Sequence, residues 1–440
     1  MYLERFSILI ISLIASGCLF VASLSSTSDR PEKSSSNNSQ KDDLVIEAAK
    51  LDQLVQEERV YNFDRLEALN DPYARISTEF DIPNSLKMRV AFWFDIYTLY
   101  NKNQHVIHHT LFPWIVYEVV DISNFLNNGK GPLWLRKQRG LDYVKARKKY
   151  IRNVLRKLSK SRSFKRLKSF ERDIYNSLLK IPGKRALVFK QASQHIRAQL
   201  GQKDFFISGL ENSSKYLEQM ETVFKNVNLP DELTRIPFVE SSFNEKAQSR
   251  VGASGVWQIM PHVGKKFSIV NNYIDERNSP IKASKVAAKL LKQNYKILKS
   301  WPLAITAYNN GIGNIKKAIH RANSRQLYNI IAKNHQGAFK FASSNFYCSF
   351  LAALHAEKYH LEIFPFMEID KEEALKKQSY RLRKSWRPIT LAKKAEMDIN
   401  TLLTYNLDLK RSIRKNRLLP KGFTLMLPPK KAKEFESKLF

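Results

Sequence analysis

The sequence predicts a mainly α protein. From residue 44 onward the apolar residues fall at helical spacing, and almost no strand-like alternation occurs before about residue 370. Of the 440 residues, 43% are hydrophobic and 26 are Phe, which is enough apolar material for real cores. A chain of this length is expected to divide into about two to four domains.

The first 45 residues have the pattern of an export signal followed by a tether. The apolar run at 6–14 is too short to span a bilayer comfortably and has the size of a signal-peptide core. Residues 1–18 end in Ala-Ser-Gly-Cys, which resembles a bacterial lipobox and makes Cys18 a candidate for lipidation, although alanine stands where leucine is usual. Ordinary cleavage at 21–23 and an uncleaved anchor are the alternatives. All three export the protein, and residues 19–45, rich in Ser, Asn and charge, are expected to form a flexible tether.

The charge balance predicts an anionic partner. The formal net charge is +33, and residues 145–168 hold twelve basic and no acidic side chains. Such a run is either a solvated helix face or a surface that docks onto stem peptides, wall polymers or lipid headgroups. We expect no nucleic-acid role, because the chain lacks zinc-finger, basic-zipper and RNA-recognition patterns and begins with an export signal.

Residues 46–205 are expected to form a basic, all-helical region. On one helix face, His105, His108 and His109 could approach a metal, but no nearby cysteine or carboxylate completes a ligand set, so we expect no metal. Lipidation of Cys18 would leave Cys348 unpaired. Since Cys348 lies in an apolar stretch, it is expected to be a small core residue.

Residues 206–365 carry the pattern with the clearest chemistry. Expected helices at 213–224, 283–298, 303–309 and 345–359 surround one acidic residue, Glu240, at the end of an apolar segment. A Gly/Ala/Ser loop follows it and leads to Gln258, which stands beside Trp257, an aromatic of the type found exposed in sugar sites. A carboxyl group on a rigid element, a loop open to a polymer and an amide for sugar hydroxyls are what cutting a glycan requires.

Residues 376–430 are expected to be a small α+β module. Short strands at 380–383 and 423–428 enclose helices at 389–396 and 399–406, which gives a strand-helix-helix-strand order.

Three blocks in order carry a family resemblance. They are Glu240-Ser241, Gly255-Val-Trp-Gln258 and Ala307-Tyr-Asn309, linked by Asp-Glu-Arg-Asn-Ser-Pro at 275–280. Residues 238–315 thereby resemble the lysozyme-like lytic murein transglycosylases, most closely the membrane-bound D type.

The resemblance implies a site and a reaction. Glu240 would act as acid and then base in cleaving the β-1,4 bond between N-acetylmuramic acid and N-acetylglucosamine, with a 1,6-anhydro product and no cofactor. The implied substrate-binding residues are Ser241, Trp257, Gln258, Tyr308, Asn309 and, as a cleft tyrosine on the last helix, Tyr347. Glu245 stands where the family commonly has proline, which bears on fine specificity.

The tail resembles a LysM module, which binds N-acetylglucosamine-containing glycans. Residues 401–406 and 419–428 match well, but Trp386-Arg-Pro-Ile stands where Gly-Asp-Thr is usual, so the module is expected to be a degenerate copy.

Three functions remain open from the sequence. The first is a lytic transglycosylase acting on peptidoglycan in the periplasm, held on the outer membrane by a lipid anchor or secreted. The second is a muramidase on the same fold that uses water, for which Glu245 is the candidate second carboxylate. The third is a non-catalytic wall-binding scaffold.

Overall fold

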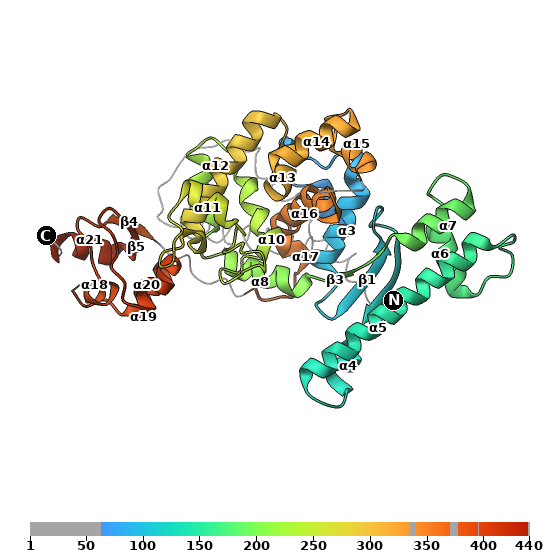
Figure 1. The fold of residues 1–440 in the computed structure, drawn as a ribbon, viewed down its shortest axis with the longest axis horizontal. Coiled ribbons are helices and arrows are strands. Elements are labelled where there is room, and N and C mark those ends of the chain that lie inside the picture. The colour runs from blue at the N-terminus through green and yellow to red at the C-terminus, as the bar shows by residue number, and fades with distance from the viewer. Residues whose placement is uncertain (1–62, 335–338, 370–376, 395, 439–440) are drawn as a thin grey trace, which may run out of the picture. The chain divides into compact units, whose positions relative to one another are not determined.

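The computed structural model describes residues 63–334, 339–369, 377–394 and 396–438. The predicted signal, Cys18 and the tether lie outside these residues. Helices dominate, which confirms the mainly α prediction (Figure 1). Within the described part of the chain, no helix has the length and apolar character needed to cross a bilayer.

The first and largest core combines segments that are far apart in the sequence. Buried residues between Ala68 and Val106 join those between Phe206 and Phe364 in one cluster. Its elements are the 3₁₀ helices η1 (Arg65–Asn70), η2 (Thr78–Phe80), η3 (Asn84–Leu86), η4 (Asp231–Arg235) and η5 (Glu276–Asn278) and the helices α3 (Lys87–Thr98), α8 (Lys203–Ser213), α9 (Leu217–Lys225), α10 (Ile236–Ser241), α11 (Pro261–Phe267), α12 (Pro280–Leu298), α13 (Trp301–Asn310), α14 (Ile312–Ala322), α15 (Leu327–Lys333), α16 (Phe341–Lys358) and α17 (His360–Ile363).

Helix α3 is fastened to α16 by polar contacts as well as by packing. The side-chain oxygen of Asn345 accepts hydrogen bonds from Arg89 and from the Trp93 indole, both at 3.0 Å. All three side chains are buried, so these bonds satisfy groups that would otherwise be costly to desolvate. The expected division at residue 205 therefore does not coincide with a boundary between cores.

A three-stranded antiparallel sheet contradicts the prediction that residues 46–205 are all helical. Its order is β2-β1-β3, formed by β1 (Gln104–His109), β2 (Val116–Asp121) and β3 (Ile196–Leu200). The segments are short, and β1 and β2 bury the β-branched residues Val106, Ile107 and Val120, which favours strands over helices. Because successive strand residues point to opposite faces, Val106 enters the first core and Ile107 the second.

The second core is formed by the sheet and by the helices that lie between β2 and β3 in the chain. It holds residues between Ile107 and Ala192, contributed by α5 (Leu133–Lys160), α6 (Ser169–Ser177) and α7 (Arg185–Gln194) together with the sheet. The short helix α4 (Ser123–Asn128) packs against the beginning of α5 (Figure 1).

The C-terminal module has the predicted strand-helix-helix-strand order and a core of its own. Strands β4 (Gln378–Arg381) and β5 (Thr424–Leu427) pair antiparallel around α18 (Pro388–Lys394) and α19 (Ile399–Tyr405). The structure adds η6 (Leu407–Leu409), α20 (Lys410–Arg414) and α21 (Pro429–Lys438). A buried ion pair of 2.7 Å joins Asp408 of this module to Lys282 of α12.

Candidate active site

Glu240 lies near the end of α10, a short helix anchored by aromatic side chains. Phe238 is buried between Phe206 and Phe243, at ring-centroid distances of 4.9 and 4.7 Å. Helix α10 ends at Ser241 and is capped by Ser242, whose φ of 49° is left-handed, so the chain turns away sharply after the acid. This arrangement places a carboxyl group at the rim of a packed core on a rigid element.

The surroundings of Glu240 favour its protonated form. Its side chain is half-buried, and burial raises its pKa from 4.5 to about 8. Within the described residues, no cation forms an ion pair with its carboxylate. A carboxyl group in this condition holds its proton at neutral pH and can donate it, which is the requirement for a general acid.

The glycine loop after α10 is held by hydrogen bonds from the predicted site residues. The Ser241 hydroxyl donates to the Val256 carbonyl oxygen at 2.8 Å. The Gln258 side-chain nitrogen donates to the carbonyl oxygens of Ala247 and Gly255, at 3.1 and 3.0 Å. The Gln258 amide therefore shapes the loop, a role that differs from the expected reading of sugar hydroxyls.

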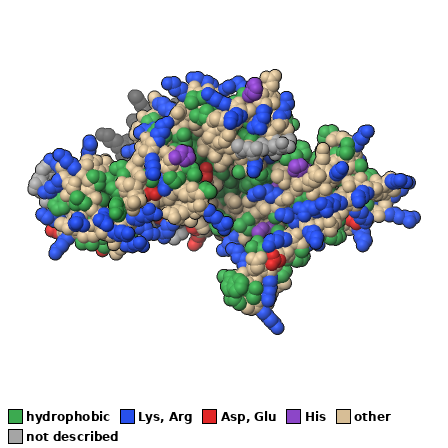
Figure 2. All heavy atoms as spheres, in the orientation of Figure 1, with side chains coloured by type: hydrophobic (Ala, Val, Ile, Leu, Met, Phe, Trp, Pro, Cys, Tyr) green, Lys and Arg blue, Asp and Glu red, His purple; other side chains and the backbone are tan. Residues whose placement is uncertain are grey.

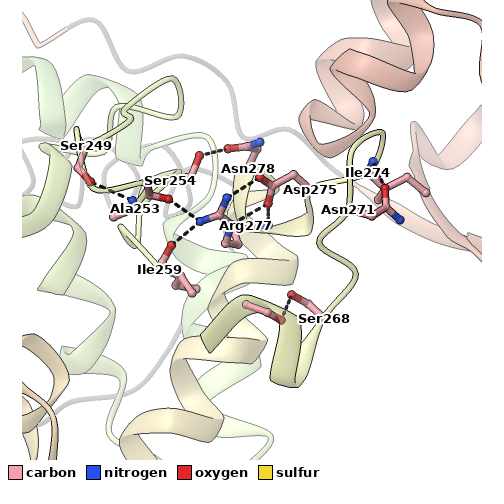
Figure 3. A network of polar contacts seen from close by, with 12 residues as sticks. Ser249, Ala253, Ser254, Ile259, Ser268, Asn271, Ile274, Asp275, Arg277 and Asn278 are labelled. Carbon is pink, nitrogen blue, oxygen red and sulfur yellow. Dashed lines mark hydrogen bonds and ion pairs between the residues drawn. The ribbon is translucent and has the colours of Figure 1, made fainter. Parts of the chain in front are cut away.

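Arg277 holds the same loop in place through hydrogen bonds to its backbone. Its guanidinium forms an ion pair of 2.7 Å with Asp275 and donates to the carbonyl oxygens of Gly252 and Ile259, at 2.7 and 2.9 Å (Figure 3). Gly255 has a φ of +73°, and a Cβ there would lie 2.0 Å from the Arg277 carbonyl oxygen, so only glycine fits. The linker at 275–280 thus supports the loop.

Trp257 is a core residue, and the expectation of an exposed aromatic in the sugar site is wrong. Its side chain is 0% exposed, stacks on Phe224 and donates to the Ser284 hydroxyl at 2.9 Å. The neighbouring glycines made the segment look open in the sequence. Packing against α9 and α12 instead turns the indole inward.

Tyr308 and Asn309 lie at the end of α13 beside a hollow. The Tyr308 hydroxyl donates to the Trp257 carbonyl oxygen at 2.8 Å, and burial together with the charge of Glu240 raises the pKa of Tyr308. Both residues line a hollow of about 420 Å³ that also includes Phe267 and Ile312. This places Tyr308 within electrostatic reach of Glu240, as expected for one site.

On the last helix, Phe346 and not Tyr347 faces Tyr308. The rings of Phe346 and Tyr308 stack with centroids 6.4 Å apart, whereas Tyr347 is buried against Phe350. The choice of Tyr347 as a cleft tyrosine is therefore not supported by the geometry. The two possibilities differ by one residue of register on α16, and the sequence alone could not resolve it.

Tyr97 of α3 is a site neighbour that sequence reasoning missed. It is buried and hydrogen-bonded to Ser349, and burial together with the charge of Glu240 raises its pKa. No motif marks it, because it comes from the N-terminal region and reaches the acid only through the shared first core.

The second carboxylate considered from the sequence, Glu245, is already engaged. It accepts a hydrogen bond of 2.6 Å from the Tyr216 hydroxyl.

The face of the protein that is in view in Figure 2 is hollowed over the region of α10 and α16.

The three histidines do not share a helix face. They lie along β1, where burial lowers the pKa of His108 to about 4 and that of His109 to about 3. Among the described residues, no three His, Cys, Asp or Glu side chains gather as a metal site would require. Cys348 is buried as predicted, and burial raises its pKa to about 12.

Comparison with known proteins identifies the central segment. Residues 219–331 match the family model described as the transglycosylase SLT domain. The membrane-bound lytic murein transglycosylase D of Escherichia coli is 35% identical over 104 residues, which are 23% of this chain and 23% of that protein. A putative tributyltin chloride resistance protein from an Alteromonas species is 35% identical over 106 residues, 24% of this chain and 51% of that protein.

One solved structure adds a distant similarity. The match to the 70 kDa soluble lytic transglycosylase of Escherichia coli covers 68% of this chain and 57% of that protein, at 14% identity and a TM-score of 0.27. The family match thus concerns the segment that contains Glu240, the glycine loop and Tyr308. The chain spans only part of the length of these relatives.

Proposed function

We propose that this chain, whose residues 219–331 form a transglycosylase SLT domain, is a peptidoglycan lytic transglycosylase. Its relatives include a protein named as a lytic murein transglycosylase, which points to murein as the substrate class. The observation that carries the proposal is the half-buried carboxyl group of Glu240, which has no ion-pair partner among the described residues and lies next to a loop held by Arg277. Burial raises the pKa of this group.

The proposed mechanism uses Glu240 twice. Its protonated carboxyl donates a proton to the glycosidic oxygen as the bond from C1 of N-acetylmuramic acid breaks. The resulting carboxylate then removes the proton from the C6 hydroxyl of the same sugar, whose oxygen bonds to C1. The products are a new hydroxyl end and a 1,6-anhydro ring, and the acid is regenerated without water or a cofactor.

A hydrolytic muramidase is the alternative on the same fold. It would need a second group to activate water or to attack the sugar. Glu245 is the nearest such acid in the sequence, and its hydrogen bond with Tyr216 gives it a structural role. This bond favours the one-carboxylate reaction over hydrolysis. A non-catalytic scaffold would not need a glutamate whose pKa is raised by burial, as that of Glu240 is.

The flanking parts fit an envelope protein. We infer export to the periplasm with lipidation at Cys18 on the outer membrane, and a LysM-like tail that is a degenerate copy. The tail has a core of its own around β4 and β5, as a degenerate glycan-binding copy would.

The test compares wild type, Glu240→Gln and Glu245→Gln on purified peptidoglycan sacculi, with mass spectrometry of the released muropeptides. We expect products one water lighter than hydrolysis products from wild type and Glu245→Gln, and none from Glu240→Gln. Reducing-end products that disappear in Glu245→Gln would establish the muramidase. Sacculi retained by all three proteins without any product would indicate a scaffold.

A further inference from the structure

The basic arm is a surface that the proposed reaction does not use. It consists of α4 (Ser123–Asn128), the turn at 129–132 and α5 (Leu133–Lys160). Helix α5 has 28 residues, so it is about 42 Å long. Its sequence contains eleven Lys and Arg residues and a single acidic one, Asp142.

Most of this charge is not neutralised within the protein. Three cations of α5 pair with carboxylates: Lys145 with Asp142, Arg147 with Glu118 and Lys157 with Glu171. The other eight have no acidic partner among the described residues. They leave a strong positive field along the helix, which Figure 2 shows as Lys and Arg side chains over α5.

The tip of the arm is apolar and exposed. Leu133 and Trp134 begin α5 with exposures of 61% and 70%, and hydrophobic side chains gather at this end of the arm in Figure 2. The spacing of Trp134, Lys145, Lys149, Arg152 and Arg156 is 11, 4, 3 and 4 residues, so they share one side of the helix. The buried residues of α5 lie on the other side.

A hollow beside the tip is also lined by both basic and apolar side chains. It has a volume of about 770 Å³ and is lined by three cations, Lys102, Arg136 and Lys137. Its apolar wall includes Leu126 and Phe205. A group with an anionic head and an apolar tail matches such a lining, since the cations meet the head and the apolar wall meets the tail.

We propose that the basic arm docks on the surface of an anionic lipid bilayer. The cations of α5 face the headgroups, and Trp134 and Leu133 enter the interface between headgroups and acyl chains, where tryptophan is favoured. A purely polar polyanion such as a wall polymer or a nucleic acid would account for the charge but not for the exposed tip. The arm therefore holds the SLT domain close to a membrane.

The first experiment uses the fluorescence of Trp134 in the full chain. Trp134 is the exposed one of the six tryptophans, the others being buried or half-buried. We expect brominated lipids in vesicles of equal parts phosphatidylcholine and phosphatidylglycerol to quench it. We expect no quenching in phosphatidylcholine alone, and loss of the quenched component in Trp134→Phe, which keeps the tip apolar. An unquenched Trp134 in protein that has bound the anionic vesicles would overturn the proposal.

The second experiment measures vesicle binding by cosedimentation with matched charge variants. Lys149→Glu with Arg156→Glu is expected to weaken binding to anionic vesicles by about 25-fold or more, because each cation near the surface contributes roughly fivefold. Lys289→Glu with Lys296→Glu makes the same charge change at the same spacing on exposed sites of α12 and should have a much smaller effect.

Residues 1–62 are identical in all variants, so binding through them cancels in the comparison. Equal weakening by both pairs would refute a specific docking face. Loss of retention on sacculi by the α5 pair, with vesicle binding unchanged, would assign the arm to a wall polymer instead. Neither readout uses catalysis, so the result is independent of the proposed reaction.

Discussion

Replacing Glu240 with glutamine should stabilise the protein in a pH-dependent way. The pKa of Glu240 is about 8 in the folded protein and 4.5 for an ordinary glutamate, so the folded state holds this proton more tightly than the unfolded chain. The stabilising effect of that proton is complete below pH 4.5 and is lost as the pH rises to about 8. Glutamine is neutral throughout and loses nothing.

The magnitude follows from linkage. Each pH unit between the two pKa values costs the wild type about 1.4 kcal/mol. At pH 7 the accumulated loss is therefore about 3 kcal/mol, against about 1 kcal/mol at pH 5. The difference in unfolding free energy between Glu240→Gln and wild type should widen by roughly 2 to 3 kcal/mol over this range.

Urea unfolding at pH 5, 6, 7 and 8, followed by far-ultraviolet circular dichroism, measures this difference. Glu79→Gln, which removes an exposed carboxylate in η2, controls for the loss of one charge. The reasoning is refuted if the advantage of Glu240→Gln is the same at pH 5 and pH 8. In that case the carboxyl group is not held protonated by burial, and its role as an acid loses its physical basis.

Three further substitutions test the support of the site. Gly255→Ala should destabilise the fold by more than about 1 kcal/mol because of its positive φ and the clash with the Arg277 carbonyl oxygen, whereas Gly313→Ala, with open space around it, should be near neutral in thermal unfolding. Arg277→Met should cost about 3 to 5 kcal/mol in urea unfolding, since it strands Asp275 without its cation; a cost under about 1 kcal/mol would argue against that account. Tyr308→Phe removes the hydrogen bond to the glycine loop and should lower muropeptide release about tenfold while costing about 1 kcal/mol of stability; unchanged release would show that this hydroxyl does not position the loop.

Short-range patterns predicted the parts of the fold that depend on local sequence. The helices around Glu240 and the strand-helix-helix-strand tail follow from periodicity and turn residues, and the structure has them. The sheet was missed because β1 is buried on both sides, so Val106 and Ile107 stand together without the alternation that marks a half-exposed strand.

The site residues that belong to a sequence motif were predictable, whereas the side-chain orientations that depend on packing were not. Glu240 and Tyr308 come from blocks with a specific order, and the structure brings them within electrostatic reach. Contacts between distant helices decide the rest: they bury Trp257, place Phe346 against Tyr308 and bring Tyr97 near Glu240. No local pattern in the sequence contains those contacts.

The shared first core has a consequence for how this protein can be divided or altered. Residues 219–331 are a unit of sequence similarity but not a unit of folding, since α3 and α16 lie outside that range and close the core around α10. A fragment cut at the edges of the match would lack Phe94 and Phe350, which are buried in the first core, and would let water reach the acid. Removing or replacing α3 or α16 would therefore lower the pKa of Glu240 without changing any residue of the motif. Glu240 therefore depends for its burial on α3 and α16, although neither helix belongs to the matched segment.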